Sequence, residues 1–116
     1  MATTQKQIVN LTIDQGATFS KTLTVTTDGS TTYNISGLTL QAQLRKSYDS
    51  SSASATFVCT IVDGSVGSYS LNLSAADTTA LAAGRYIYDV ELILADSTYD
   101  KVHAGQATIL PEATKI

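Results

Sequence analysis

The stretch that decides the fold is SAADTTALAAGRYIYDVELIL, residues 74–94, which joins a short helical signal to the clearest alternating strand of the chain. Ser74 is a candidate N-cap, because its hydroxyl can accept a hydrogen bond from the free amides of a first helical turn. Asp77, three residues on, completes a pattern similar to a capping box. The pattern predicts one short helical turn near 75–81, which Gly84 would close in the left-handed conformation.

The strand that follows the turn has apolar side chains at alternate positions, namely Tyr86, Tyr88, Val90, Leu92 and Leu94. Asp89 and Glu91 mark the opposite face as solvated. The spacing matches the corner before the sixth strand of immunoglobulin domains, where a tyrosine two positions ahead of a buried cysteine bonds back to the backbone. Tyr86 is therefore the expected corner residue, and Tyr88 takes the position of the cysteine.

The rest of the chain repeats the alternating pattern in short runs separated by turn residues. Gly105 is the expected position of a β-bulge near the end of the chain. About seven or eight short strands predict an all-β protein, an immunoglobulin-like antiparallel β-sandwich with one short helical turn. Besides the strand described above, we expect strands over 7–13, 17–26, 38–47, 55–62, 69–73, 98–103 and 107–110, and a short edge segment over 31–35.

The length of 116 residues is that of one domain. We expect a single β-sandwich over residues 1–116, with 1–6 as an arm that is flexible or ordered by a partner and 112–116 as a short tail. Hydrophobic residues make up 43% and charged residues 15%, so Ser and Thr must supply much of the polar surface. A net charge of −3 disfavours nucleic-acid binding, because that function needs clustered Lys and Arg.

Cys59 is the only cysteine of the sequence, which excludes an intrachain disulfide and a multi-cysteine zinc site. A lone cysteine fits synthesis in a reducing cytoplasm. The first residues lack the basic start and apolar run of a signal peptide, and no run reaches transmembrane length. We therefore expect a soluble protein with no membrane partner.

The residues that could carry chemistry form no recognisable constellation. His103 is the only histidine of the sequence, and no G-x-S-x-G, H-E-x-x-H or paired-cysteine pattern accompanies it. We expect His103 at the surface or at a strand end, and Cys59 as a small buried apolar residue. Asp89 and Glu91 share a face, but a calcium site needs more oxygen ligands than they offer. The sequence predicts no catalytic residue, metal site or cofactor, and hence no enzyme.

Exposed apolar and aromatic positions are the candidates for contacts with partners. Val58 and Val62 fall on the outward face of a strand whose two faces are both rather apolar. Tyr48 and Tyr99 fall near loops or edges, where aromatic side chains often mark interfaces. A sandwich with open strand edges needs a partner or protection. These residues therefore favour a role in assembly.

Segments of the chain resemble a known group of proteins when taken together: IDQGATFSKTLTV (13–25), SGLTLQAQLRKSY (36–48) and LSAADTTALAAGRYIYDVEL (73–92). Their order and spacing are similar to those of small structural domains of tailed bacteriophages. That group includes the N-terminal domain of upper baseplate proteins and stand-alone virion proteins of cyanophage-like viruses. GQATILPEATK (105–115) is similar to the group's last strand, whereas TTYN (31–34) departs from its more usual Asp-Leu-Thr-Gly turn.

The resemblance implies a non-enzymatic component of a phage particle, in the tail, baseplate or neck, or as a capsid decoration protein. It implies other virion proteins and copies of the same chain as partners, a location in the virion and synthesis in the host cytoplasm. The alternative is a carbohydrate- or receptor-binding module, for which Tyr48 and Tyr99, with the aspartates near them, are the candidate residues.

Overall fold

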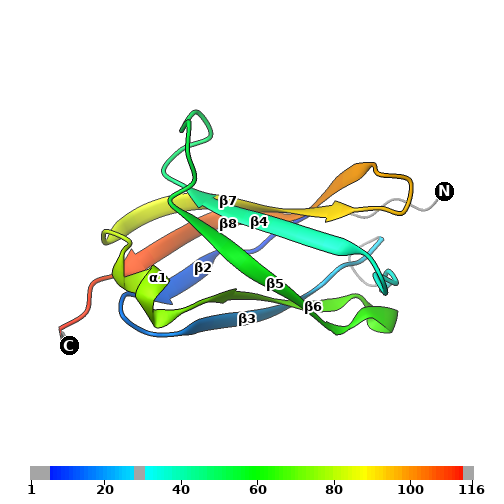
Figure 1. The fold of residues 1–116 in the computed structure, drawn as a ribbon, viewed down its shortest axis with the longest axis horizontal. Helices are drawn as coiled ribbons and strands as arrows, with labels where there is room; N and C mark the ends of the chain where they lie inside the picture. Colours follow the sequence, from blue (N-terminus) through cyan, green and yellow to red (C-terminus); the bar gives the residue numbers. More distant parts are fainter. Residues whose placement is uncertain (1–5, 28–30, 114–116) are drawn as a thin grey trace.

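The computed structural model describes residues 6–27 and 31–113, so residues 1–5 of the expected arm and 114–116 of the expected tail lie outside the described residues. The described chain is all-β, as predicted (Figure 1). Its elements, in order, are β1 (Gln7–Ile8), β2 (Leu11–Asp14), β3 (Phe19–Thr24), β4 (Thr39–Arg45), β5 (Ala55–Asp63), the 3-10 turn η1 (Gly64–Val66), β6 (Ser68–Leu73), α1 (Ala75–Thr79), β7 (Gly84–Ile93) and β8 (Tyr99–Leu110).

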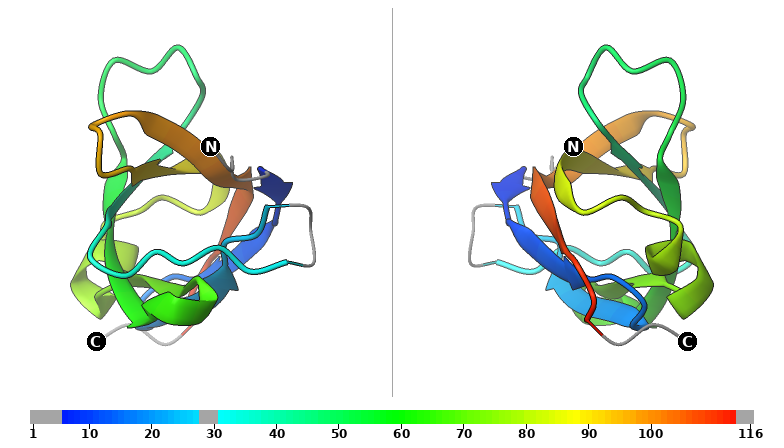
Figure 2. Two further views of the ribbon diagram at one scale, coloured as in Figure 1. Left: turned by 90° about the vertical axis from the view of Figure 1, so that its right-hand side faces the viewer. Right: turned by 90° about the vertical axis from the view of Figure 1, so that its left-hand side faces the viewer.

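The strands form one sheet in the order β1-β8-β7-β4-β5-β6-β3, and β2 also pairs with β8. Most neighbouring strands are antiparallel, but β1 and β2 run parallel to β8. The end views of Figure 2 show how the sheet curls, with β5 as a side wall and β2 toward the other side. The curled sheet surrounds the hydrophobic core, and the earliest strands of the chain lie beside the last one.

β5 belongs to both halves of the curled sheet. Residues Ala55 to Phe57 pair with β4, whereas Val58 and the residues after it pair with β6. In Figure 1, the end of β4 lies close to the start of β5, and the two strands diverge from there, because β5 leaves the layer of β4 and crosses to that of β6. Phe57 is buried at this crossing, and its ring packs against those of Phe19 and Tyr88. Aromatic side chains therefore fill the place where the two layers join.

The N-terminal part of the chain departs from the predicted strands in two places. The predicted strand over 7–13 is divided, because Val9 and Asn10 separate β1 from β2. The prediction of an edge strand over 31–35 is wrong, because Thr32 makes only an isolated bridge with Thr26 and residues 31–35 contain no strand.

β8 is one continuous strand where two shorter ones are predicted. Its register against β7 shifts by one residue at Val102, so the predicted bulge at Gly105 is wrong in position. The extra residue reverses the alternation of the strand, and neighbouring odd-numbered residues point to opposite faces. Lys101 is therefore exposed, whereas His103 is buried in the core.

α1 lies within the range predicted for a helical turn and begins at the expected cap. The Ser74 hydroxyl oxygen accepts a hydrogen bond from the Asp77 amide at 3.1 Å. The helix ends earlier than predicted, with Ala80 as its C-cap in the right-handed conformation. The predicted role of Gly84 as a left-handed cap is wrong: Gly84 opens β7 with a φ of 142°, which glycine adopts easily.

Thr78 attaches α1 to the turn between β2 and β3. Its buried hydroxyl accepts a hydrogen bond from the Gly16 amide at 3.1 Å and donates one to the Ala17 carbonyl at 2.8 Å. The Gln15 side chain donates to the Leu81 carbonyl at 2.7 Å in the same region. A helix of this length is unstable alone, so these bonds hold it in place.

The corner between α1 and β7 is built around Tyr86. Its hydroxyl donates to the Ala82 carbonyl at 2.8 Å, and its ring is buried. The Lys46 ammonium lies 4.4 Å from the centre of that ring, in the geometry of a cation–π contact. These contacts join the start of β7 to the backbone before it and to the end of β4.

Candidate functional site

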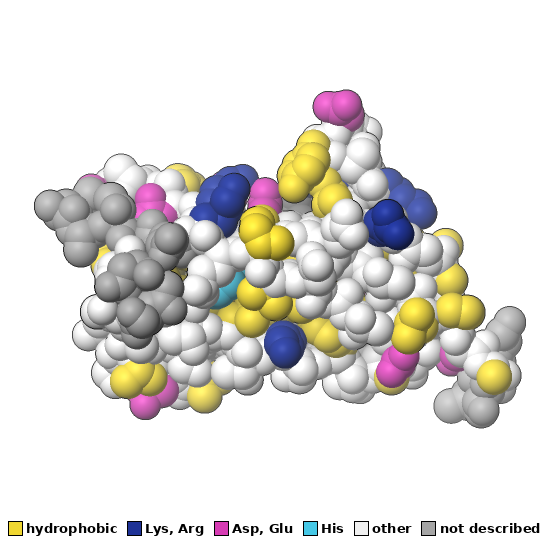
Figure 3. All heavy atoms as spheres, turned by 180° about the vertical axis from the view of Figure 1, so that it is seen from behind, with side chains coloured by type: hydrophobic (Ala, Val, Ile, Leu, Met, Phe, Trp, Pro, Cys, Tyr) yellow, Lys and Arg dark blue, Asp and Glu magenta, His cyan; other side chains and the backbone are white. Residues whose placement is uncertain are grey.

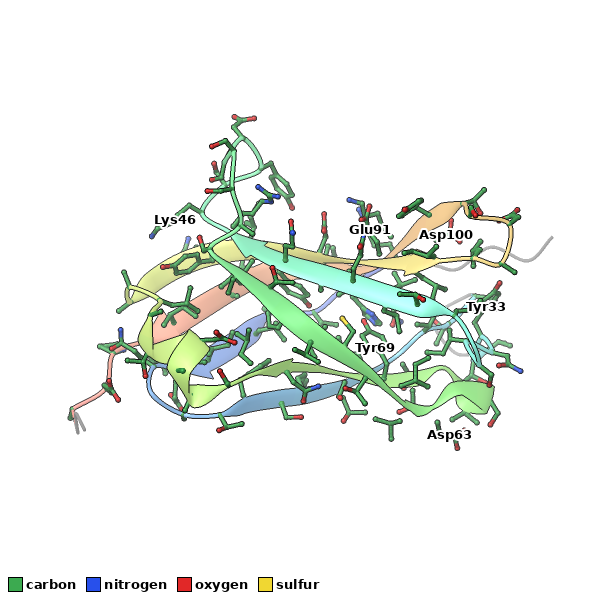
Figure 4. All side chains as sticks on the ribbon, in the orientation of Figure 1. Tyr33, Lys46, Asp63, Tyr69, Glu91 and Asp100 are labelled. Atoms are coloured by element: carbon green, nitrogen blue, oxygen red, sulfur yellow. The ribbon has the colours of Figure 1, made fainter. Side chains whose placement is uncertain are left out.

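A polar pair lies in the interior, formed by Tyr69 of β6 and His103 of β8. The Tyr69 hydroxyl oxygen is 2.6 Å from Nδ1 of His103, and the exposed fractions of the two residues are 0% and 1%. Figure 4 shows Tyr69 pointing into the space between the two layers of the sheet. The prediction of a surface or strand-end histidine is therefore wrong, and the bulge at Val102 is the reason.

Burial keeps both members of this pair neutral. It lowers the pKa of His103 to about 4, although a hydrogen bond with the Thr24 backbone opposes that shift. It also raises the pKa of the Tyr69 hydroxyl far above its usual value. The hydrogen bond with the Thr24 backbone takes a ring N–H, and in the tautomer that leaves Nδ1 without a proton the Tyr69 hydroxyl donates to Nδ1. The pair acts as a neutral link between layers and lacks the exposure that a reacting group needs.

A second buried link connects Tyr88 with the break between β1 and β2. The Tyr88 hydroxyl donates to the Val9 carbonyl at 2.5 Å, and the Val9 amide donates to the Ala104 carbonyl at 2.9 Å. Gly105 pairs with Tyr88, and a Cβ atom on Gly105 would lie 2.4 Å from the Val9 carbonyl oxygen. Glycine is therefore needed at this position so that the N-terminal segment can approach β8 closely.

The outer face of β4, β7 and β8 carries charged side chains. The Lys101 ammonium lies 2.9 Å from an Asp89 oxygen and 3.6 Å from a Glu91 oxygen. The hydrogen bond to Asp89 is the main cause that raises the pKa of Lys101. Gln41 donates to the other Glu91 oxygen at 3.0 Å. Figure 4 shows Glu91 projecting from this face, away from the core.

The loop over residues 46–54 stands above one end of this charged face, as Figures 1 and 3 show from opposite sides. Tyr48 is 74% exposed on the loop. Beneath it is a hollow of about 240 Å³, lined by Gln43, Arg45, Tyr48, Ile87, Tyr88, Asp89 and Lys101. The structure thus brings Tyr48 together with charged and amide side chains that are far from it in the sequence, such as Asp89 and Lys101.

The outer face of β3, β6 and β5 has the opposite character, because the residues that point outward from it carry hydroxyl, amide and apolar groups. Lys21 of β3 is exposed, but it pairs with the buried Leu71 and so has the parity of the other face. Among the described residues of this face, the first charge is Asp63, at the end of β5. Val58 and Val62 lie on it with exposed fractions of 63% and 59%. Beside them are Ser20, Thr22, Thr24, Thr60, Ser68, Ser70 and Asn72.

Tyr99 lies apart from Tyr48. It is 58% exposed and pairs with Ile93, near the end of β7, whereas Arg45 beside the Tyr48 hollow pairs with Ile87. This separation along β7 corresponds to about 20 Å. The four predicted contact residues therefore lie in three places, with Tyr48 over the charged face, Val58 and Val62 on the uncharged face, and Tyr99 near the β7–β8 turn.

The other groups with possible chemistry are not assembled into a site. Burial raises the pKa of Cys59 to about 11, which disfavours the reactive thiolate. Within residues 6–27 and 31–113, no cluster of His, Cys, Asp and Glu could hold a metal ion. No helix in the same ranges has the length and apolar character needed to cross a membrane.

Comparison with known proteins adds no relative to this description. No protein-family model and no curated protein sequence matches the chain.

Proposed function

We propose that the chain is a non-enzymatic structural component of a tailed-phage virion, in the tail, baseplate or neck or on the capsid. It works through contacts with other virion proteins and with copies of itself. The resemblance of the segments over 13–25, 36–48 and 73–92 to small phage structural domains supports this proposal. We further infer that the curled sheet is an immunoglobulin-like β-sandwich, which the corner bond from Tyr86 to Ala82 supports.

The uncharged face of β3, β6 and β5 is the observation that carries the proposed function. Interface centres are depleted of charge, and the exposed side chains of Val58 and Val62 would lose water-exposed apolar area on contact. Asn72 links the three strands of this face, because its side chain donates to the Val58 carbonyl at 3.0 Å and accepts from the Ser20 hydroxyl at 2.8 Å. An ordered, uncharged surface of this kind suits repeated contacts in an assembly.

The first test asks whether the chain is in particles. Virions produced from the genome that encodes the chain would be purified, and their proteins would be identified by mass spectrometry. The expected result is the chain at a fixed copy number per particle, with cryo-EM density of its size. Absence of the chain from infectious, intact particles would overturn the proposed function.

The second test asks which face makes the contact. The double variant V58E/V62E should lower incorporation at least tenfold, because each glutamate would be desolvated in the interface. The matched control is T39E/Q106E, which adds the same charge at exposed positions on the outer face of β4 and β8. Both variants should melt close to the wild type. Normal incorporation of V58E/V62E would show that another face makes the contact.

A further inference from the structure

We propose that the hollow beneath Tyr48 is a binding site for a neutral saccharide. The hollow has a volume of about 240 Å³, and a neighbouring one of about 150 Å³ shares Gln43 and Asp89 with it. The two hollows adjoin on the outer face of β4 and β7, and together they are called the groove below. Ligand sites of roughly 300–1,000 Å³ are typical for small molecules, so the groove has the size for a short oligosaccharide.

Tyr48 supplies the apolar side of the site. An aromatic ring offers a flat apolar surface with a polar tip, and the C–H faces of sugar rings pack on such surfaces. Ile87 lines the same hollow and extends the apolar contact. The ring is exposed on the loop, so a ligand can reach it without moving any part of the core.

The loop that carries Tyr48 is fixed by hydrogen bonds on both sides of that residue. The Arg45 guanidinium donates to the Ser50 carbonyl at 2.8 Å, and the Ser47 amide donates to the Ser50 hydroxyl at 3.1 Å. The Ser54 amide closes the loop by donating to the Leu44 carbonyl at 2.7 Å. Because this backbone is already ordered, a ligand loses less binding free energy to ordering the loop.

The floor of the groove offers donors and acceptors on planar side chains. The Arg45 guanidinium donates to the side-chain oxygen Oε1 of Gln43 at 2.7 Å. This bond fixes the orientation of the Gln43 amide and leaves its NH₂ group to donate to a ligand. Lys101 holds one carboxylate oxygen of Asp89, and among the described residues the other oxygen takes no hydrogen bond. An amide donor and a carboxylate acceptor on paired residues match the alternating demands of neighbouring sugar hydroxyls.

The charges of the site select a neutral ligand. Arg45 and Lys101 are balanced by Asp89 and Glu91, and Lys101 lies between the two carboxylates. The groove therefore has no excess positive charge to attract a phosphate, a sulfate or an acidic sugar. A neutral molecule with many hydroxyls uses the polar floor without leaving a charge unbalanced.

The proposal is tested on the full chain with a printed array of neutral and acidic oligosaccharides, followed by calorimetry with the best neutral ligand. We expect binding to neutral glycans and a loss of at least tenfold in affinity for Y48A, from the missing stacking contact. D89N should weaken binding as well, because the amide presents a donor where the carboxylate accepts. Y99A is the matched control, because it removes another exposed tyrosine that lies far from the groove, and it should leave the affinity unchanged.

Y48A removes an exposed side chain, so its melting temperature should equal that of the wild type. A loss of binding by Y48A can then be distinguished from a loss of folded protein. Absence of binding to every glycan, binding confined to acidic glycans, or equal affinity of Y48A and wild type would each overturn the proposal. The saccharide proposal does not depend on the proposed virion role. A chain that is absent from particles could still bind a saccharide, and a chain that is present in particles could fail to bind one.

Discussion

The hydroxyl oxygen of Tyr69 and Nδ1 of His103 lie 2.6 Å apart and join β6 to β8 across the core. Burial disfavours the charged imidazole here, and protonation would also remove the acceptor that neutral Nδ1 offers to the Tyr69 hydroxyl. The fold therefore holds a group that titrates near neutral pH in its unprotonated form. The stability of the protein must then depend on pH.

We expect the free energy of unfolding to fall as the pH is lowered from about 6.5 to about 4. His103 has a pKa of about 4 in the folded protein and 6.5 as its ordinary value, so the unfolded chain binds the proton more tightly. The contribution of His103 to the free energy of unfolding is fully present above pH 6.5, the pKa in the unfolded chain. It decreases by about 2 kcal/mol between pH 7 and pH 4.5. Urea denaturation at both pH values measures the difference.

The control for this prediction is H103Q, which keeps a side chain able to hydrogen-bond but removes the titration. Its loss of stability between the same two pH values should be smaller than that of the wild type by the amount stated. Equal pH dependence of the two proteins would show that His103 is not responsible.

The corner tyrosine gives a second prediction. Y86F keeps the buried ring and removes the hydroxyl that donates to the Ala82 carbonyl. We expect a loss of about 1 kcal/mol in the free energy of unfolding, the usual contribution of such a bond. Y99F, at an exposed tyrosine, should change stability by less than about 0.5 kcal/mol. Denaturation curves that coincide for Y86F and wild type would contradict a stabilising corner.

Gly105 gives a third prediction. G105A would bring a methyl group against the Val9 carbonyl, where the neighbouring atom belongs to backbone and cannot move easily. We expect a cost of about 1–3 kcal/mol and faster hydrogen exchange of the Val9 amide, which donates to the Ala104 carbonyl.

The matched variant is Y88F, which releases the same Val9 carbonyl without adding an atom and should cost about 1 kcal/mol. Both changes detach the same segment, so the double variant should lose less stability than the sum of the single losses. Strict additivity, with unchanged exchange at Val9, would argue against a shared contact.

Thr78 gives a fourth prediction. T78V has nearly the same shape but leaves the Gly16 amide and the Ala17 carbonyl without the buried hydroxyl. We expect a loss of about 2 kcal/mol, since two hydrogen bonds of the buried hydroxyl are lost at about 1 kcal/mol each. T79V is the control, because Thr79 is exposed and its hydroxyl bonds within the helix. Thermal melts of the two variants should therefore differ, and equal melting temperatures would contradict the role of Thr78.

The strands of this fold could be predicted because each buries one face, and burial imposes a period of two residues. The corner could be predicted as well, because Tyr86 lies at a fixed distance before a core position. These features depend on residues close together in the sequence. The predicted strand ends differ from the observed ones by only a few residues in β4, β5 and β6.

The position of the bulge could not be predicted, because it depends on pairing with another strand. Gly105 was the expected position of the bulge because glycine is common in bulges, yet the register shift lies at Val102. The burial of His103 follows from that shift and was missed for the same reason. A signal was present: Lys101 has the same parity as the apolar Ala107 and Ile109, and an extra residue between them lets one strand expose the lysine and bury the other two.

Of the residues that line the groove beneath Tyr48, the sequence indicated only Tyr48 as a candidate for contacts with a ligand or partner. Tyr48 stands out as an aromatic residue in a serine-rich loop, but its neighbours come from β4, β7 and β8. The grouping of Tyr48 with Asp89 depends on which strands are adjacent, which the alternating pattern does not specify. Val58 and Val62 needed only parity, and both are exposed as expected.

The parallel pairing of β2 with β8 has a mechanical consequence. The rungs run from Leu11 with Ala107 to Asp14 with Leu110, so the start of β2 and the end of β8 lie at opposite ends of the pair. A force that pulls the two ends of the chain apart would load these hydrogen bonds together, in shear, instead of opening them one after another. The chain should therefore resist stretching along this axis far better than its modest length suggests.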